Sequence, residues 1–210
     1  MSAHEPTTTS HPALMPTHWS RHLAVNLADY VHACVAESQE GSDLGQVGVE
    51  DFFEQRRLTV GSYLYCDLVE LSVGFAIPDS LYRSPVFSRM RQVWNDLTSL
   101  VNDLASVPKE LAAGDLLHNL VLLTHHRDAI PLSQAARQVS AHIEDLAETF
   151  TALEEQLETE ADRQGLSAGD RKGVGRCVQA MEAFIAGEQR WHELSSRYTQ
   201  VSARHAANGP

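Results

Sequence analysis

The stretch VNDLASVPKELAAGD, residues 101–115, places an amide, a hydroxyl and a carboxylate four residues apart, at Asn102, Ser106 and Glu110. On an α-helix, residues i, i+4 and i+8 drift by about 40° per step, so the three side chains share one face. Oxygen donors of these kinds suit Mg²⁺, which completes its shell with water and phosphate oxygens. The stretch therefore predicts a helix with a metal site, and places Lys109 beside it.

A second set of residues repeats this spacing one heptad earlier, at Asn95, Ser99 and Asp103. Asn, Ser and acidic residues also occur at such offsets on solvated helix faces, where they bind no metal. Periodicity alone leaves three interpretations open: a metal site in the later register, one in the earlier register, or an ordinary polar face.

The composition restricts the class of protein. A chain of 210 residues is long enough for one domain with a sizeable core. Its net charge of −12 argues against a nucleic-acid partner, because phosphate backbones are held by clustered Lys and Arg. No apolar run approaches the roughly 20 residues that cross a membrane, and the first residues do not resemble a secretory signal. Three scattered cysteines predict a reducing, cytoplasmic location.

The pattern along the chain predicts an all-α helical bundle without β-alternation or internal repeats. We expect a flexible tail over residues 1–16, a helical domain over 17–200 and a C-terminal tail over 201–210. Gly61 is expected to break one helix into two. The expected helices cover residues 19–35, 49–58, 61–75, 85–112, 115–127, 131–164 and 175–206, with a glycine-rich loop at 165–175 and an interruption near Gly187.

Three separated blocks carry a resemblance to a known family. NDLASVPKE with the following GDLLHNLVLL resembles the metal-binding motif of class I terpene synthases, especially the bacterial cyclases, and its continuation. Upstream, QRRLTVGSYLYCDLVELSVGFAIP (55–78) is similar to the family's arginine segment, and AGEQRWHELSSRY (186–198) resembles its terminal block. Only Asn102 is followed by a Lys-Glu pair, so the resemblance selects the later register.

The resemblance implies an isoprenoid-synthase fold and an enzyme that ionises and cyclises an isoprenyl diphosphate, such as farnesyl or geranyl diphosphate, with release of pyrophosphate. Mg²⁺ is the implied cofactor, with Mn²⁺ as an alternative. Thr59 would link the arginine segment to a backbone carbonyl near Val60, which would face the cation being formed. The implied site residues are Arg56, Lys109, Arg197 and Tyr198 for the diphosphate, and Asn102, Ser106 and Glu110 for the metal.

The sequence also departs from the family pattern. Upstream of Arg56 there is no counterpart of the family's second, Asp-rich metal motif, and the segments 67–70 and 144–148 only look like it. The matched part corresponds to the C-terminal portion of the family's domain, so a homodimer or a partner chain would supply the early helices. The alternative is a non-catalytic homologue or a partner subunit that binds diphosphate or another chain.

Pro108 lies inside the metal motif. It removes the hydrogen bond to the carbonyl of Leu104, so we expect a kink that shifts Glu110 relative to Asn102.

Overall fold

The computed structural model describes residues 15–38 and 48–195, and within these ranges every regular element is a helix. The prediction of an all-α fold is confirmed. The α4 turn was not expected from the sequence, and the helix expected from residue 115 begins five residues later. The helices are α1 (Thr17–Glu37), α2 (Val49–Thr59), α3 (Ser62–Val73), α4 (Asp79–Tyr82), α5 (Pro85–Ala113), α6 (Leu120–Arg127), α7 (Leu132–Arg163) and α8 (Ala168–Leu194).

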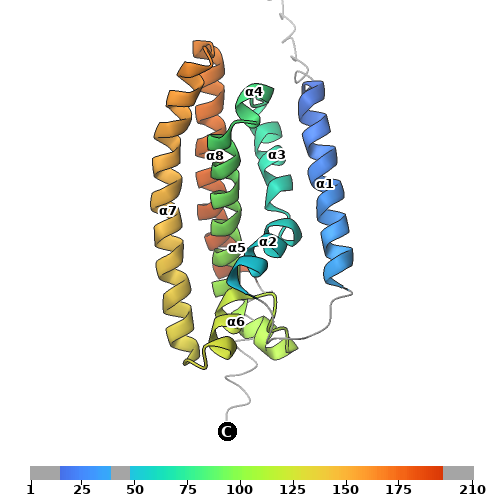
Figure 1. Cartoon of the computed structure of the whole chain (residues 1–210), viewed down its shortest axis with the longest axis vertical. Coiled ribbons are helices and arrows are strands. Elements are labelled where there is room, and N and C mark those ends of the chain that lie inside the picture. The colour runs from blue at the N-terminus through green and yellow to red at the C-terminus, as the bar shows by residue number, and fades with distance from the viewer. Residues whose placement is uncertain (1–14, 39–47, 196–210) are drawn as a thin grey trace, which may run out of the picture.

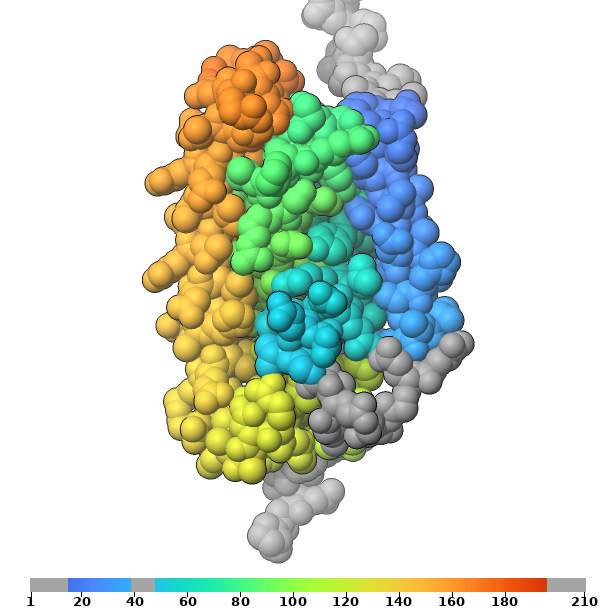
Figure 2. All heavy atoms as spheres, viewed as in Figure 1, coloured from blue at the N-terminus to red at the C-terminus, as the bar shows by residue number. Residues whose placement is uncertain are grey.

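The long helices run alternately up and down as an antiparallel bundle (Figure 1). Helix α5 is its centre and packs against α7, α8 and α3, while α1 lies along the outer side of α3. Helices α2 and α6 lie toward the end of the bundle where α5 finishes. In Figure 2, α2 (cyan) covers the middle of the visible face between α1 (blue) and α7 (orange and yellow).

Sequence signals at both ends of α5 explain its length. Ser84 caps the N-terminus by accepting a hydrogen bond from the backbone N–H of Phe87, and Pro85 occupies the first turn, where its missing N–H is harmless. Apolar side chains of its first half fill the core, and the fully buried Trp94 donates from its indole nitrogen to the carbonyl of Met181 on α8 (2.8 Å). Burying such a side chain contributes about 1.5–3 kcal/mol.

The break predicted at Gly61 is confirmed. Its φ of +77° lies in the left-handed region, which glycine adopts without strain, and it separates α2 from α3. The ring of Tyr30 on α1 lies 3.3 Å from where a Cβ would stand, so a side chain at this position would also be crowded. The break leaves Arg56 and Thr59 in the last turns of α2, close to the end of α5.

Two expectations about the last helix were wrong. The glycine-rich segment is not a loop up to residue 175, because α8 begins at Ala168 and runs unbroken through Gly187. Ser167 caps it by accepting from the N–H of Asp170, a signal that outweighs the glycines behind it. At Gly173 the glycine serves close packing, since a Cβ there would lie 2.4 Å from the ring of Phe75.

No helix in the described part of the chain is both long and apolar enough to span a membrane.

Candidate metal and diphosphate site

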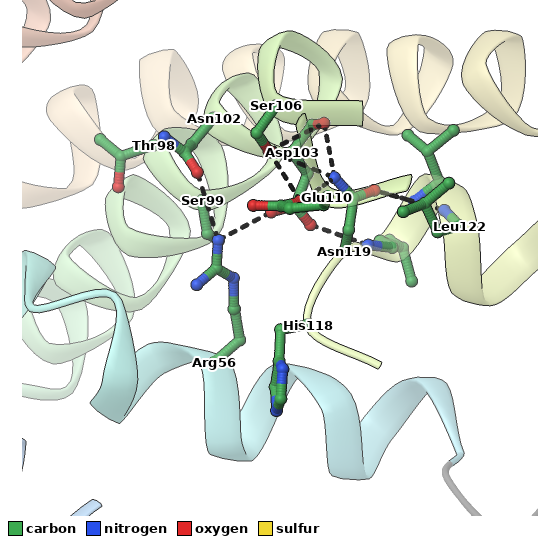
Figure 3. A network of polar contacts seen from close by, with 12 residues as sticks. Arg56, Thr98, Ser99, Asn102, Asp103, Ser106, Glu110, His118, Asn119 and Leu122 are labelled. Atoms are coloured by element: carbon green, nitrogen blue, oxygen red, sulfur yellow. Dashed lines mark hydrogen bonds and ion pairs between the residues drawn. The ribbon is translucent and has the colours of Figure 1, made fainter. Parts of the chain in front are cut away.

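The predicted site residues converge where α5 ends, beside α2 and the start of α6 (Figure 3). Arg56 reaches across from α2, and Asn102, Ser106 and Glu110 come from α5. Ser106 and Glu110 are buried, while Asn102 is half-buried. The face that carries them is thus turned inward rather than solvated, and the interpretation as an ordinary exposed polar face is wrong.

Ser106 and Glu110 lie in direct contact. The hydroxyl of Ser106 donates to Oε2 of Glu110 at 2.9 Å. Two neighbouring ligands on an octahedral Mg²⁺ ion lie about 3 Å apart, so this pair has a spacing that such an ion accepts. Lys109 extends its Nζ to 3.5 Å from Oε1 of the same glutamate, which brings a cation to the edge of the pair.

Pro108 does not end helix α5. Helix α5 continues through the proline to Ala113, and Pro108 lies on its exposed side. The contact between Ser106 and Glu110 spans the proline and is intact. A kink at Pro108 that shifts Glu110 relative to Asn102 stays a prediction, while the Ser106–Glu110 contact across the proline is kept.

Asn102 faces Arg56. Its Oδ1 lies 3.4 Å from Nη2 of the arginine, and its Nδ2 lies 3.2 Å from Nε2 of His192 near the end of α8. The amide therefore joins three helices: α2, α5 and α8. It brings one predicted metal ligand and the predicted diphosphate-sensing arginine to the same point.

Arg56 is fixed by a buried ion pair with Asp103. Its Nη2 donates to Oδ1 of Asp103 at 2.8 Å, and Oδ2 of that carboxylate accepts from the backbone N–H of Leu120. Burial alone would lower the pKa of Arg56, but the Asp103 carboxylate raises it above its usual range. The guanidinium therefore stays charged in a position that points at the metal ligands.

Several buried polar atoms around Arg56 have no hydrogen-bond partner among the described residues. They are Nε of Arg56, Oγ1 of Thr59 and Oε2 of Glu188. Buried polar groups normally find partners, so such orphans point to a ligand or water between them. Burial raises the pKa of Glu188 to about 7, and the charge of Arg56 opposes that rise. Donors of Arg56 thus remain available for an anion, which fits a diphosphate.

The residues of the earlier register are engaged in structural contacts. Asn95 donates to the carbonyl of Arg57 on α2, and Ser99 donates to backbone carbonyls of its own helix. Asp103, the third member, holds Arg56. Asn95 and Ser99 act as donors in these contacts, and Asp103 is paired with the guanidinium of Arg56.

Sequence reasoning missed three residues near this site, Asn119, Glu188 and His192, and it considered Asp103 only as a possible ligand of the earlier register. The pairing of Asp103 with Arg56 could not be read from spacing, because Arg56 comes from another helix. The predicted residues Arg197 and Tyr198 lie outside the described residues. Across the described ranges no cluster of three His, Cys, Asp or Glu side chains could hold a metal ion, so a metal here would rely on the mixed amide, hydroxyl and carboxylate set.

Comparison with known proteins identifies the family. A family model described as "Terpene synthase family 2, C-terminal metal binding" matches residues 8–149, well over half of the chain. The chain belongs to this terpene synthase family. The match includes Arg56 and all three predicted metal ligands, so the predicted family is confirmed, as is the presence of a domain type that binds metal.

Curated relatives of this terpene synthase chain include pristinol synthase of Streptomyces pristinaespiralis, 29% identical over 91% of the chain and 49% of the relative. Epi-isozizaene synthase of Streptomyces coelicolor is 30% identical over 89% of the chain and 52% of the relative. Among solved structures, a variant of cucumene synthase superposes with a TM-score of 0.78 at 26% identity, covering 89% of this chain and 60% of that one. The chain spans about half the length of the curated relatives it matches.

Proposed function

We propose that this protein takes part in the metal-dependent ionisation and cyclisation of an isoprenyl diphosphate, such as farnesyl or geranyl diphosphate, with release of pyrophosphate. The observation that carries the proposal is the convergence of Arg56, Asn102, Ser106 and Glu110 at one end of the bundle. Names of relatives such as epi-isozizaene synthase and pristinol synthase support the same class of reaction.

The chemistry requires residues of these types. Ionisation breaks the bond between the allylic carbon and the diphosphate oxygen, leaving a carbocation and a polyanion. Asn102, Ser106 and Glu110 would hold a divalent cation, Mg²⁺ or Mn²⁺, which would act as a Lewis acid on the diphosphate. Arg56 offers its remaining donors to diphosphate oxygens, and Lys109 adds a compact positive charge. By resemblance, Arg197 and Tyr198 would complete the diphosphate contacts.

The direct test is incubation of the purified protein with C10, C15 and C20 isoprenyl diphosphates and Mg²⁺, followed by hydrocarbon and pyrophosphate analysis. We expect turnover to require the metal and to fall at least about 100-fold in Glu110→Ala and in Arg56→Ala. Arg163→Ala, on the exposed side of α7, serves as the matched arginine control and should retain activity. Unchanged turnover in both site variants would show that the proposed site is wrong.

We propose that the activity also requires a partner chain. The apolar side chains exposed on α1 and α3 support this. Helix α1 exposes Leu27, Val31 and Val35 at i, i+4 and i+8, and the adjacent α3 exposes Leu68 and Leu71. Each of these side chains is 40–52% exposed. Large apolar side chains exposed on two neighbouring helices are typical of an interaction surface. We propose that it packs against helices of a partner chain, equivalent to the part of the relatives that this chain does not match.

Co-expression tests this requirement. The part of epi-isozizaene synthase outside the match would be produced together with this chain, and complex formation would be measured by co-purification and light scattering. We expect a 1:1 complex that Leu68→Glu weakens and that Leu111→Glu, an exposed leucine at the end of α5, leaves intact. A stable homodimer that excludes the added fragment would instead identify a second copy as the partner.

An outcome without turnover, in which the protein still binds metal and pyrophosphate, would favour the non-catalytic alternative. A cytoplasmic location is part of the proposal, supported by the three cysteines Cys34, Cys66 and Cys177, which are free thiols.

A further inference from the structure

Asn119 occupies a position that links the predicted metal ligands to the next helix. It is fully buried and stands immediately before α6. Its Oδ1 accepts from the backbone N–H groups of Val121 and Leu122, which caps the helix. The other half of the amide points the opposite way, toward α5 (Figure 3).

The amide nitrogen of Asn119 contacts the predicted metal ligands. Nδ2 lies 2.6 Å from Oε2 of Glu110 and 3.3 Å from Oγ of Ser106, and it donates to the backbone carbonyl of Asp103 at 2.7 Å. A cap alone needs only an oxygen acceptor, so serine, threonine or aspartate would serve as well. The donor side of the amide is an additional feature that capping does not require.

The consequence for Glu110 is a fixed orientation. With Oε2 held by Asn119 and Ser106, the carboxylate cannot rotate freely, and Oε1 is directed to the side where Lys109 approaches. A carboxylate ligand that a neighbouring donor holds in place binds a metal more tightly than one that must be ordered on binding. The same amide also donates to the backbone carbonyl of Asp103. It therefore holds in place the segment of α5 whose Asp103 side chain pairs with Arg56.

We propose that Asn119 is a positioning residue for the metal site, which orients Glu110 and Ser106 from the N-cap of α6. The proposal rests on the proposed function in that it takes Glu110 and Ser106 as the metal ligands. Asn119 itself is not one of the proposed metal ligands. The proposal predicts that the N-cap of α6 and the orientation of the metal ligands both depend on the Asn119 side chain.

Asn119→Ser separates the two roles, because serine keeps the cap acceptor but is too short to reach Glu110. Binding of Mn²⁺ with inorganic pyrophosphate would be measured by calorimetry, and the Mn²⁺ environment by electron paramagnetic resonance. We expect the variant to bind about 10–100-fold more weakly than the wild type, the range found for residues that orient metal ligands. Ser84→Ala is the matched control, because it removes the cap of α5 and should leave Mn²⁺ binding unchanged.

The outcomes separate this inference from the proposed function. If the wild type binds Mn²⁺ and Glu110→Gln does not, but Asn119→Ser binds as the wild type, the positioning role is overturned and the site stands. If the wild type itself binds no Mn²⁺ with pyrophosphate, both fall.

A second variant covers the case in which Asn119→Ser does not fold. Asn119→Asp retains size and cap while placing an acceptor against Glu110, so we expect an altered Mn²⁺ resonance line shape. A line shape and affinity equal to the wild type would also overturn the inference.

Discussion

Two groups of buried carboxyl side chains stabilise different parts of this bundle in different ways. At the α5–α6 end, Asp103 pairs directly with the Arg56 guanidinium. On α3, Asp67 and Glu70 are also buried, but the donors to them are neutral. Asn26 donates to Asp67 at 2.8 Å, and the backbone N–H of Ile77 donates to Glu70 at 2.8 Å. One group thus contains a charge pair, and the other contains acids without a bonded cation.

The difference appears in their protonation. Burial raises the pKa of Asp67 to about 6 and that of Glu70 to about 8, since hydrogen bonds to neutral donors offset only part of the desolvation. Glu70 is therefore largely neutral at pH 7. At the α5–α6 end burial also raises the pKa of Asp103, but the charge of Arg56 opposes that rise, and Asp103 in turn keeps Arg56 charged. Glu70 thus makes a neutral structural contact at pH 7, whereas the α5–α6 group keeps the charge of Arg56 in a fixed position, which a diphosphate site requires.

The largest effect is expected for Asp103→Ala. Removing this carboxylate leaves the buried Arg56 without its partner, and breaking a buried pair costs about 3–5 kcal/mol of the free energy of unfolding. Chemical denaturation would measure the change. Asp162→Ala, which removes an exposed pair with Arg171, should cost less than about 1 kcal/mol. Equal losses in the two variants would contradict the distinction between the buried and the exposed pair.

The pH dependence of the free energy of unfolding tests whether Glu70 of the α3 group is protonated in the folded protein. The folded-state pKa of Glu70 is raised, so its contribution to the free energy of unfolding is full below its ordinary pKa near 4.5. That contribution is lost as the pH rises through about 8. At about 1.4 kcal/mol per pKa unit, the loss is on the order of 3 kcal/mol after allowance for residual hydration. We expect Glu70→Gln to flatten the stability profile between pH 5 and pH 8.

The control for this pH series is a variant of the α5–α6 group, Asp103→Asn. Asp103→Asn should lower the free energy of unfolding at pH 7, because Arg56 loses its charged partner. A Glu70→Gln profile parallel to that of the wild type would show that Glu70 is ionised in the folded protein. The contrast between the two groups would then fail.

Much of the fold was predictable because its signals are local. Apolar positions at helical spacing gave the long helices, and the single Gly61 gave the break between α2 and α3. The glycines near residue 170 misled, because Gly173 is needed for contact with Phe75 of a distant segment and not for a turn. Periodicity within one segment carries no information about such a contact.

The candidate site was predictable only in part for the same reason. Motif resemblance pointed to Arg56, Asn102, Ser106 and Glu110, whose proposed roles are tied to their spacing in the sequence. Asn119 follows Glu110 by nine residues, an offset without helical meaning, and reaches it only because the chain folds back between α5 and α6. Similarly, Glu188 comes near Arg56 through the packing of α8, which no local pattern specifies.

The smallest effect, and the one that separates stability from binding, is expected for Thr59→Val. The buried Oγ1 of Thr59 has no partner in the described structure, so replacing it with a methyl group should raise the free energy of unfolding by up to about 1 kcal/mol. Thr98→Val is the matched control. It removes a buried hydroxyl that bonds to Ser62 and to the carbonyl of Asn95, and should lower the free energy of unfolding by about 1 kcal/mol.

Binding should respond in the opposite direction at Thr59. If its hydroxyl is left unpaired so that a ligand or ordered water can use it, Thr59→Val should weaken pyrophosphate binding by up to about 10-fold, the equivalent of one hydrogen bond. Thr98→Val should leave pyrophosphate binding unchanged. A Thr59→Val variant that gains stability and loses no affinity would mean that the orphaned hydroxyl has no part in binding, and that Arg56 contacts the anion without it.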